Sequence, residues 1–368
     1  MIPTIPTIPT IPTIPALPLS HLESGGMTIS VIVPAHNAAG YLRHSLPALQ
    51  RSTYPAFECI VVDDASTDDT AAVCQAFAVQ RVGLTGAPHG PATARNRGAA
   101  VSQGDILLFL DTDVVVRPET LSRLAAAFQN ETTVAAIFGS YDDRPLAANF
   151  VSQAKNLLHH FTHQQARPDA TTFWAGCGAI RRSAWQAVGG FDEQRYRRPS
   201  IEDIELGYRL AAAGYPIRLD KGLLVKHIKR WTLLSLLRSD VRDRAWPWAW
   251  LALERRRLPN DLNSHTSQRV SALLTWGIVG SVAGAWLRAR RRRSSRAAFV
   301  QQIAPPAGLT GLGAFAGVLW PNRSLYRFLW RQRGFGFVLA FVPLHLLYYL
   351  YSTTAFGLAA LAWRAQKH

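Results

Sequence analysis

The sequence has few cysteines and, relative to its basic residues, few acidic ones. Its three cysteines, Cys59, Cys74 and Cys177, are too few and too scattered to form a disulfide framework, and no zinc-finger spacing is present. Such a cysteine content fits a reducing cytosol. The N-terminal segment also lacks the basic start and the continuous apolar stretch of a signal peptide.

The charge balance is strongly basic, with 40 Lys and Arg against 24 Asp and Glu and a formal net charge of +16. A nucleic-acid binder and a protein of the anionic membrane surface can both carry such an excess. The acidic residues concentrate before about residue 205, whereas arginines cluster after residue 229 and flank apolar runs. Because no aromatic-basic RNA signature is present, this distribution favours a membrane partner, and we expect no nucleic-acid partner.

The composition changes along the chain predict four segments. Residues 1–26 contain an Ile-Pro-Thr repeat whose prolines remove backbone donors, so we expect disorder there, and Met27 is an alternative start. Residues 27–232 are predicted to form the catalytic domain. Residues 233–269 are predicted to be an amphipathic, interfacial connector, and residues 270–368 a membrane-associated helical region.

Strand and helix patterns alternate from Thr28 onward, which predicts a doubly wound, mostly parallel α/β sheet with flanking helices. The expected strands are 29–33, 58–62, 82–84 and 106–110, and the expected helices are 39–51, 69–80 and 92–102. Ligands of such sheets bind beyond the carboxyl ends of the strands. The acidic motifs Asp63-Asp64 and Asp111-Thr112-Asp113 both follow strands, so we expect them to share one site.

Three uncharged runs follow: Val270–Leu287, Ile303–Trp320 and Gly334–Trp363. About 20 apolar residues span a bilayer, and the third run is the strongest candidate, whereas Pro305-Pro306 weaken the second. Three tyrosines of the third run are expected either at a membrane interface or between helices: Tyr348, Tyr349 and Tyr351.

The topology of these runs is contradictory. If the catalytic half is cytosolic and all three runs cross, the arginines of 288–293 lie outside, against the positive-inside tendency. Either the first two runs form a re-entrant or interfacial hairpin, or the rule is broken.

The acidic motifs suggest metal and nucleotide binding. Carboxylates of Asp111 and Asp113 can ligate a divalent cation that neutralises a diphosphate. The alternative for Asp63-Asp64 is a helix cap completed by Ser66 or Thr67. That alternative does not explain two carboxylates on the strand side of the turn.

Several sequence blocks together resemble the family 2 glycosyltransferases, which have the GT-A fold. They are Ile32-Val33-Pro34-Ala35-His36-Asn37, Val61 to Asp68, Ala94-Arg95-Asn96-Arg97-Gly98, Phe109 to Asp113, and Gly189-Gly190-Phe191-Asp192 with Glu202 to Leu206. The resemblance implies a membrane-anchored, bacterial-type enzyme that takes a sugar from a nucleotide-sugar donor. It extends over about residues 28–232.

The resemblance also implies roles for individual residues. Nucleotide-sugar binding falls to Pro34, His36, Asn37, Asp64, Arg95 and Asp111, with Asp64 facing the base. Asp113 binds the metal, Mg²⁺ or Mn²⁺, together with Asp111 and in one alternative His227. Arg95 has the alternative role of capping its own helix.

The pair Glu202-Asp203 resembles the catalytic acidic motif of the family. An inverting transfer needs a base for the acceptor hydroxyl, and Asp203 is the expected base with Glu202 supporting it. The alternative is that both merely begin a helix, where acidic residues favour the dipole. Glu205 is expected to be an exposed helical residue. The upstream glycines Gly176 and Gly178 are expected in the acceptor floor.

The segment His227-Ile228-Lys229-Arg230-Trp231 partly resembles the Gln-x-x-Arg-Trp motif of processive polysaccharide synthases, with His in place of Gln. Trp231 is then expected to stack on an acceptor sugar and Arg230 to meet the diphosphate. An amphipathic interfacial helix is the equal alternative.

These features together predict an inverting, metal-dependent glycosyltransferase at the cytoplasmic (inner) membrane, with its catalytic domain facing the cytosol. The expected acceptor is a lipid-linked or membrane-proximal glycan of the cell envelope. A polyprenyl-phosphate glycosyl synthase is the alternative within the class, and a non-catalytic membrane scaffold is the alternative outside it.

Overall fold

The structure is a computed structural model, and it describes residues 26–255, 266–292 and 307–366. The chain divides into two compact units. The first contains residues up to Gly139 together with Thr172–Ile228, and the second contains Ser140–Thr171 together with Lys229–His368. The Ile-Pro-Thr repeat lies outside the described residues.

The sheet has nine strands: eight follow the order β3-β2-β1-β4-β8-β6-β9-β5, and the ninth, β7, pairs with β9. The strands are β1 (Ile29–Ala35), β2 (Phe57–Asp64), β3 (Gln80–Leu84), β4 (Ile106–Leu110), β5 (Val114–Val115), β6 (Ala136–Tyr141), β7 (Asp169–Ala170), β8 (Cys177–Arg181) and β9 (Ile217–His227).

The parallel strands are the ones that the sequence predicted. β1 lies between β2 and β4 and is parallel to both, and β3 is parallel to β2. All five residues of β4 are buried, as expected for a strand covered on both faces. β8 reverses direction and pairs antiparallel with β4 and β6, so the sheet is mixed rather than entirely parallel.

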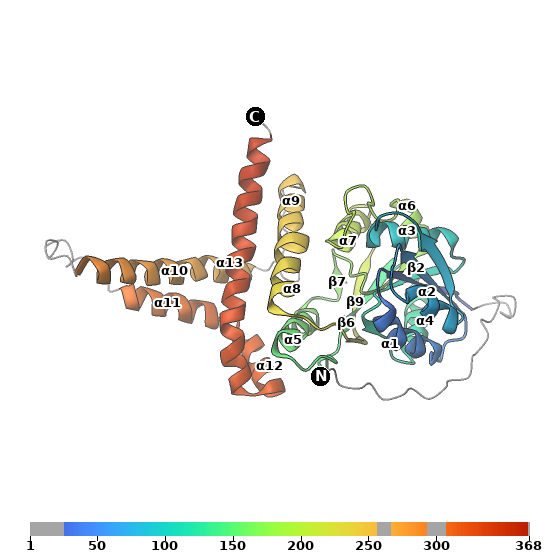
Figure 1. The fold of residues 1–368 in the computed structure, drawn as a ribbon, viewed down its shortest axis with the longest axis horizontal. Helices are drawn as coiled ribbons and strands as arrows, with labels where there is room; N and C mark the ends of the chain where they lie inside the picture. Colours follow the sequence, from blue (N-terminus) through green and yellow to red (C-terminus); the bar gives the residue numbers. More distant parts are fainter. Residues whose placement is uncertain (1–25, 256–265, 293–306, 367–368) are drawn as a thin grey trace. The chain divides into compact units, whose positions relative to one another are not determined.

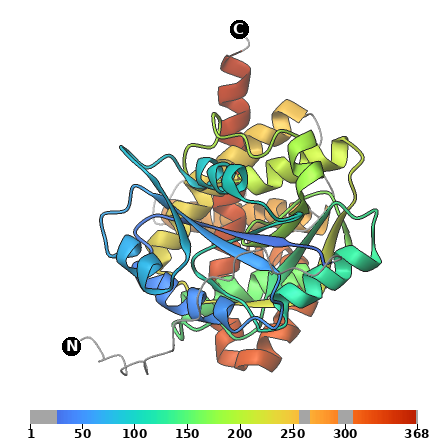
Figure 2. The ribbon, with the colours of Figure 1, turned by 90° about the vertical axis from the view of Figure 1, so that its right-hand side faces the viewer.

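Helices flank this sheet on both faces (Figures 1 and 2). They are α1 (Ala39–Gln50), α2 (Thr70–Ala76), α3 (Pro91–Val101), α4 (Thr120–Asn130), α6 (Arg182–Ala187) and α7 (Glu202–Ala212). The predicted helix 69–80 was too long. Ala78 adopts a left-handed φ of 50°, and the chain then re-enters the sheet at Gln80.

The second unit is helical. Its helices are α5 (Phe150–Gln165), α8 (Leu233–Arg238), the π-helix η2 (Ser239–Ala245), α9 (Trp246–Arg255), α10 (Thr266–Arg292), α11 (Ala307–Leu319), α12 (Arg323–Arg333) and α13 (Phe335–Ala365). Among the described residues, two helical segments are long and apolar enough to cross a membrane, Ser267–Leu287 and Phe335–Ala365. They coincide with the first and third predicted runs.

Candidate active site

The loops that follow β1 and β2 are joined by side-chain hydrogen bonds. Asn37 has a left-handed φ of 49°, and its Oδ1 accepts from the backbone N–H of Thr67 at 2.8 Å. The hydroxyl of Ser66 accepts from the Asn37 N–H at 2.9 Å. His36 Nδ1 lies 2.7 Å from the carbonyl oxygen of Asp64. The loops after β1 and β2 are therefore joined at the carboxyl edge of these neighbouring strands. His36 and Asn37, which were predicted to line the nucleotide pocket, lie in the first of these loops, shortly after Pro34 of β1.

Asp64 is buried at the end of β2 and is held by the loop that precedes α3. Its carboxylate accepts from the backbone N–H groups of His89 at 2.9 Å and Gly90 at 2.7 Å, and His89 Nδ1 lies 3.0 Å away. Gly90 has a φ of 96°, and a Cβ there would lie 2.6 Å from the Arg197 backbone. The glycine is therefore required where the loop meets Asp64.

Arg95 is the centre of the acidic site. It lies on α3 with 4% of its surface exposed. Its Nη2 donates to Asp111 Oδ1 at 2.8 Å, and its Nη1 donates to Glu202 Oε1 at 2.7 Å. The guanidinium also lies 5.4 Å from the ring centroid of Phe191. Arg95 thus connects the end of β4 to the start of α7, instead of capping its own helix.

Asp203 lies beside this cluster in the first turn of α7. Its Oδ2 accepts from the Ala175 N–H at 3.1 Å, and its Oδ1 accepts from the Ile204 N–H at 2.8 Å. Burial and the neighbouring Glu202 charge raise the pKa of Asp203 to about 6, although Arg95 opposes the shift. Its carboxylate is therefore ionised at neutral pH and is more basic than an ordinary aspartate, which suits proton transfer.

The predicted floor glycines lie directly beside the acidic residues. The carbonyl of Gly176 accepts from the Asp111 N–H at 3.2 Å, and Gly178 pairs with Phe109 of β4. A Cβ on Gly176 would lie 2.4 Å from the Trp174 indole, and one on Gly178 would lie 2.3 Å from the Trp174 carbonyl oxygen. Both positions therefore admit only glycine without rearrangement.

Asp113 and His227 are brought together by the pairing of β5 with β9, in which Val114 is opposite His227. His227 Nε2 lies 3.8 Å from Asp113 Oδ2. No group of three His, Cys, Asp or Glu residues is placed to hold a metal within residues 26–255, 266–292 and 307–366. One carboxylate and one imidazole nevertheless suit a divalent cation whose remaining ligands are diphosphate oxygens.

Arg230 and Trp231 lie in the second unit. Trp231 is 6% exposed, its N–H donates to the Ser152 hydroxyl at 2.7 Å, and its carbonyl accepts from Asn149 at 2.7 Å. Arg230 is exposed. Residues 228–232 contain no helix, so the predicted interfacial helix at 227–231 is absent from this described stretch.

One expectation about α7 was wrong, because Glu205 is buried and not exposed. It pairs with Arg209 one turn later at 2.8 Å, and Arg209 also donates to the Gly190 carbonyl at 2.6 Å. His89, which holds Asp64, was missed because a single histidine in a glycine-rich loop has no spacing signal. Phe191 beneath Arg95 belongs to a block that the sequence did single out.

Comparison with known proteins identifies the class. Residues 30–189 match the family model described as glycosyl transferase family 2. This segment is therefore a glycosyl transferase family 2 domain, and the mixed, mostly parallel sheet with its flanking helices is the GT-A fold that the sequence predicted.

Individual proteins are similar over part or most of the chain. The validoxylamine A glucosyltransferase of Streptomyces hygroscopicus subsp. jinggangensis is 29% identical over 52% of this chain and 53% of that protein. The pre-mycofactocin glycosyltransferase of Mycobacterium tuberculosis is 31% identical over 55% and 43%. The chain thus spans about half the length of these curated relatives.

A solved structure resembles a larger share of the chain. It is the mannosyltransferase PcManGT of Pyrobaculum calidifontis, in complex with GDP-Man and Mn²⁺. Its TM-score is 0.56 with 20% identity, and the alignment covers 88% of both chains. At this identity the likeness supports the fold.

Proposed function

We propose that the chain is an inverting, metal-dependent glycosyltransferase that moves a sugar from a nucleotide-diphosphate sugar to a membrane-proximal or lipid-linked glycan. The observation that carries the proposal is the cluster around Arg95, which joins Asp111 to the Glu202-Asp203 pair. A donor-side carboxylate and a basic carboxylate are thereby fixed in one site. The family 2 domain supports the same reaction class.

The donor is proposed to bind at the carboxyl edge of β1, β2 and β4. The backbone around Pro34, His36 and Asn37 would form the wall of the nucleotide pocket, and Asp64 would face the base. Asp113, with Asp111 or His227, would hold Mg²⁺ or Mn²⁺, which neutralises the charge that develops on the diphosphate. The GDP-Man and Mn²⁺ bound to PcManGT agree with such a donor site.

In the proposed reaction, Asp203 accepts the proton of the acceptor hydroxyl. That oxygen forms a bond to the anomeric carbon from the side opposite the diphosphate, and the configuration inverts. The bond from the anomeric carbon to the donor oxygen breaks, and the nucleoside diphosphate leaves with its electron pair. Glu202 is paired with Arg95 and accepts from the Ser200 N–H at 2.9 Å, so its role would be to position Asp203.

The acceptor is proposed to be presented at the cytoplasmic face of the inner membrane. Two apolar helical segments of the second unit support membrane attachment. Arg230 is exposed and is proposed for the acceptor or diphosphate side, whereas the burial of Trp231 does not support stacking on an acceptor sugar.

Transfer by the purified, detergent-solubilised chain tests the proposal. Nucleotide sugars are first screened by thermal shift with Mn²⁺, since a bound donor raises the melting temperature. Transfer is then measured for the unaltered chain, Asp113→Ala and Asp203→Asn, with Asp69→Asn as the matched exposed control. We expect EDTA and both site variants to abolish turnover while the control is unaffected. Unchanged turnover in both variants would contradict the site.

The same assay separates two acceptor classes. A hydroxyl acceptor needs a base, whereas a polyprenyl phosphate is already an anion. Retained activity of Asp203→Asn on polyprenyl phosphate would therefore assign the chain as a polyprenyl-phosphate glycosyl synthase. Absence of binding to every nucleoside diphosphate in calorimetry would instead indicate a non-catalytic scaffold.

A further inference from the structure

α13 contains one buried stripe along most of its 31 residues. The stripe consists of Phe341, His345, Tyr349, Ala355 and Ala359, each at most 4% exposed. Its spacing is close to the helical period, so it marks a single face. A helix that crosses a bilayer would have to separate from the charged, water-exposed part of the protein at the point where it enters the lipid. From Phe341 to Ala359, however, α13 stays packed on the rest of the second unit.

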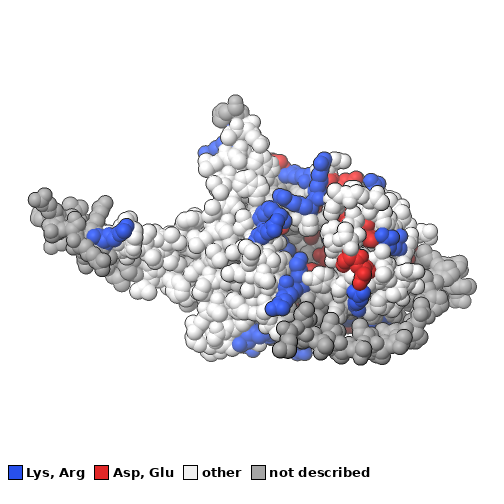
Figure 3. Space-filling view, in the orientation of Figure 1, with Lys and Arg blue, Asp and Glu red and all other residues white. Residues whose placement is uncertain are grey.

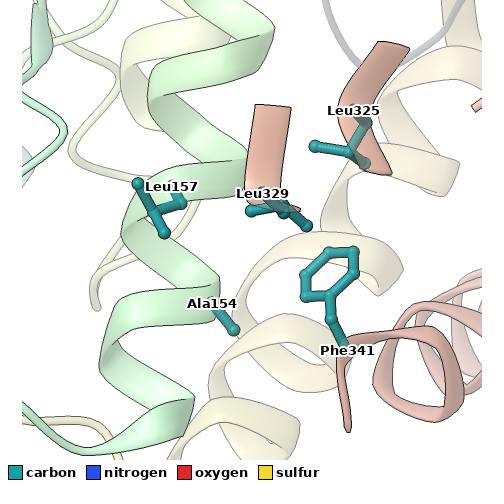
Figure 4. Packing of buried hydrophobic residues seen from close by; sticks show 5 residues of the cluster. All are labelled: Ala154, Leu157, Leu325, Leu329 and Phe341. Atoms are coloured by element: carbon teal, nitrogen blue, oxygen red, sulfur yellow. The ribbon is translucent and has the colours of Figure 1, made fainter. Parts of the chain in front are cut away.

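The first part of the stripe packs on helices of the second unit that bear no membrane-length apolar run. Phe341 contacts a cluster formed by Ala154 and Leu157 of α5 and by Leu325 and Leu329 of α12 (Figure 4). At the junction before α13, Arg333 donates to the Gln153 side chain at 2.8 Å and to the Asp143 carbonyl at 3.0 Å. The start of α13 is therefore fixed to α5 and to the segment that precedes it.

Tyr349, in the middle of the stripe, packs on Ala272 of α10 and Val318 of α11. α13 also contacts η2 and α9, which are too charged to lie in hydrocarbon. They carry Asp240, Arg242, Asp243, Arg244, Glu254 and Arg255. The Tyr351 hydroxyl, near the middle of α13, donates to Asp240 Oδ2 at 2.6 Å, and Lys155 Nζ donates to Asp240 Oδ1 at 2.6 Å. If α13 crossed the bilayer, these charges would lie near its centre, at a cost of several kcal/mol each.

The opposite face of α13 is apolar and exposed. Leu339, Leu358 and Leu361 are 58%, 53% and 64% exposed, and no Asp, Glu, Lys or Arg lies between residues 335 and 363. Figure 3 shows this surface free of charged side chains over most of its length. Trp330, 58% exposed, and Arg331 lie just before α13, a pairing suited to anionic headgroups.

The α10–α11 hairpin contacts α13 through the first part of α10. The Trp276 indole N–H donates to Thr353 at 2.8 Å, and Gln268 accepts from Tyr349 at 2.6 Å. Beyond Trp276, α10 packs on α11 through small residues such as Gly277 and Gly311. The hairpin extends away from α13 (Figure 1), with Val282 64% exposed. Close packing of small residues is typical of helices in lipid.

We propose that α13 lies along the membrane surface without crossing it, with its apolar face on the lipid. The partner of the α13 face is the headgroup and upper acyl region of an anionic bilayer. This inference rests on the membrane attachment in the proposed function, but it is independent of the catalytic chemistry.

Cysteine labelling on both sides of α13 tests the proposal. Arg331→Cys and Gln366→Cys flank the helix, Ala126→Cys on α4 marks the catalytic side, and the chain without an added cysteine gives the background. A membrane-impermeant maleimide is applied to sealed vesicles before and after permeabilisation. We expect Arg331→Cys and Gln366→Cys to react from the same side, that of Ala126→Cys. Reaction from opposite sides would show that α13 crosses and would overturn the proposal.

Depth measurements give a second, independent readout. Fluorophores at Leu339→Cys and Leu358→Cys lie 19 residues apart, about 28 Å along the helix axis. In vesicles with anionic lipid, quenchers at defined depths are expected to place both at the same shallow level. Placement in opposite leaflets would overturn the proposal. Release of the whole chain by a carbonate wash would instead contradict membrane attachment itself, while the transfer assay would still test the catalytic site.

Discussion

Each of the two units contains a buried ion cluster, and the two clusters differ in their balance of charge. In the first unit, Arg95 bonds Asp111 and Glu202 at 2.8 and 2.7 Å, with Asp203 beside them. In the second unit, Lys155 and Asp240 form a pair at 2.6 Å that is completed by the hydroxyl of Tyr351.

The difference shows in the proton affinities. Three carboxylates share Arg95, and the pKa of Asp203 is raised to about 6 by burial and by the Glu202 charge. Burial alone would also raise the pKa of Asp240, but Lys155 and Arg244 hold it below its usual range. An excess of acid creates a base suited to chemistry, whereas a matched pair stabilises the packing of helices.

The largest expected effect is that of Arg95→Gln. The substitution leaves Asp111 and Glu202 without their shared cation. Both donor binding and the positioning of Asp203, the proposed base, are therefore disturbed. We expect turnover to fall by about 10³- to 10⁵-fold, and stability to fall by about 3–5 kcal/mol. Thermal melting in detergent and single-turnover transfer measure the two effects.

Two variants control for Arg95→Gln. Arg95→Lys retains the charge but loses the two-pronged geometry, and we expect intermediate activity. Arg123→Gln removes an ion pair with Asp220 whose arginine is 48% exposed, and it should cost less than about 1 kcal/mol. Equal losses from Arg95→Gln and Arg123→Gln would show that burial of the first cluster has no special effect.

Asp203→Asn separates activity from stability. Because the folded-state pKa of Asp203 is about 6 and the reference value is 3.8, the folded protein holds this proton more tightly than the unfolded chain. Stability therefore falls as pH rises from about 4 to 6 and then stays lowered. Removing the charge should make the variant more stable at pH 8 by at most about 3 kcal/mol, while turnover falls about 10²- to 10⁴-fold.

The pH dependence gives the matching measurement. For the unaltered chain, kcat/KM should rise with pH through about 6, as Asp203 loses its proton. The melting temperatures of the two proteins should be closest near pH 4. A variant that is less stable than the unaltered chain at pH 8 would contradict the raised pKa.

The sequence was sufficient for the parts of the fold and site that depend on local pattern. β4 was predicted with its observed bounds because its five residues are all apolar and end at Asp111. The carboxyl edge of the parallel strands then places His36, Asp64 and Asp111 on one side, as expected. These positions follow from strand direction alone.

Long-range contacts could not be predicted in the same way. Arg95 reaches Glu202 across 107 positions, and no spacing rule links the two. Glu205 is at a helical position typical of exposed residues, but tertiary packing buries it with Arg209. His89 became part of the site only because Gly90 permits a close turn against Asp64.

Breaking the second cluster tests whether its role is structural. Asp240→Asn leaves the Lys155 ammonium, whose side chain is 19% exposed, without its carboxylate, and should cost about 3 kcal/mol. Replacing both residues with apolar ones, Lys155→Met with Asp240→Leu, should cost less. Both proteins, measured by thermal melting, should retain donor affinity in calorimetry. Loss of donor affinity in the double variant would show that this cluster also serves the site.

The smallest expected effect is that of Tyr351→Phe, which removes one hydrogen bond to the Asp240 carboxylate and leaves the ring in place. A hydrogen bond to a charged group contributes about 1.5–3 kcal/mol, and the remaining Lys155 bond lowers the expected loss to about 1 kcal/mol. In the Asp240→Asn background the same substitution should have almost no effect, because the charged acceptor is gone. Thermal melting of the four proteins of this double-mutant cycle measures the coupling. Additive losses would mean that Tyr351 and Asp240 stabilise α13 independently, and the second cluster would then be a simple ion pair with a neighbouring tyrosine.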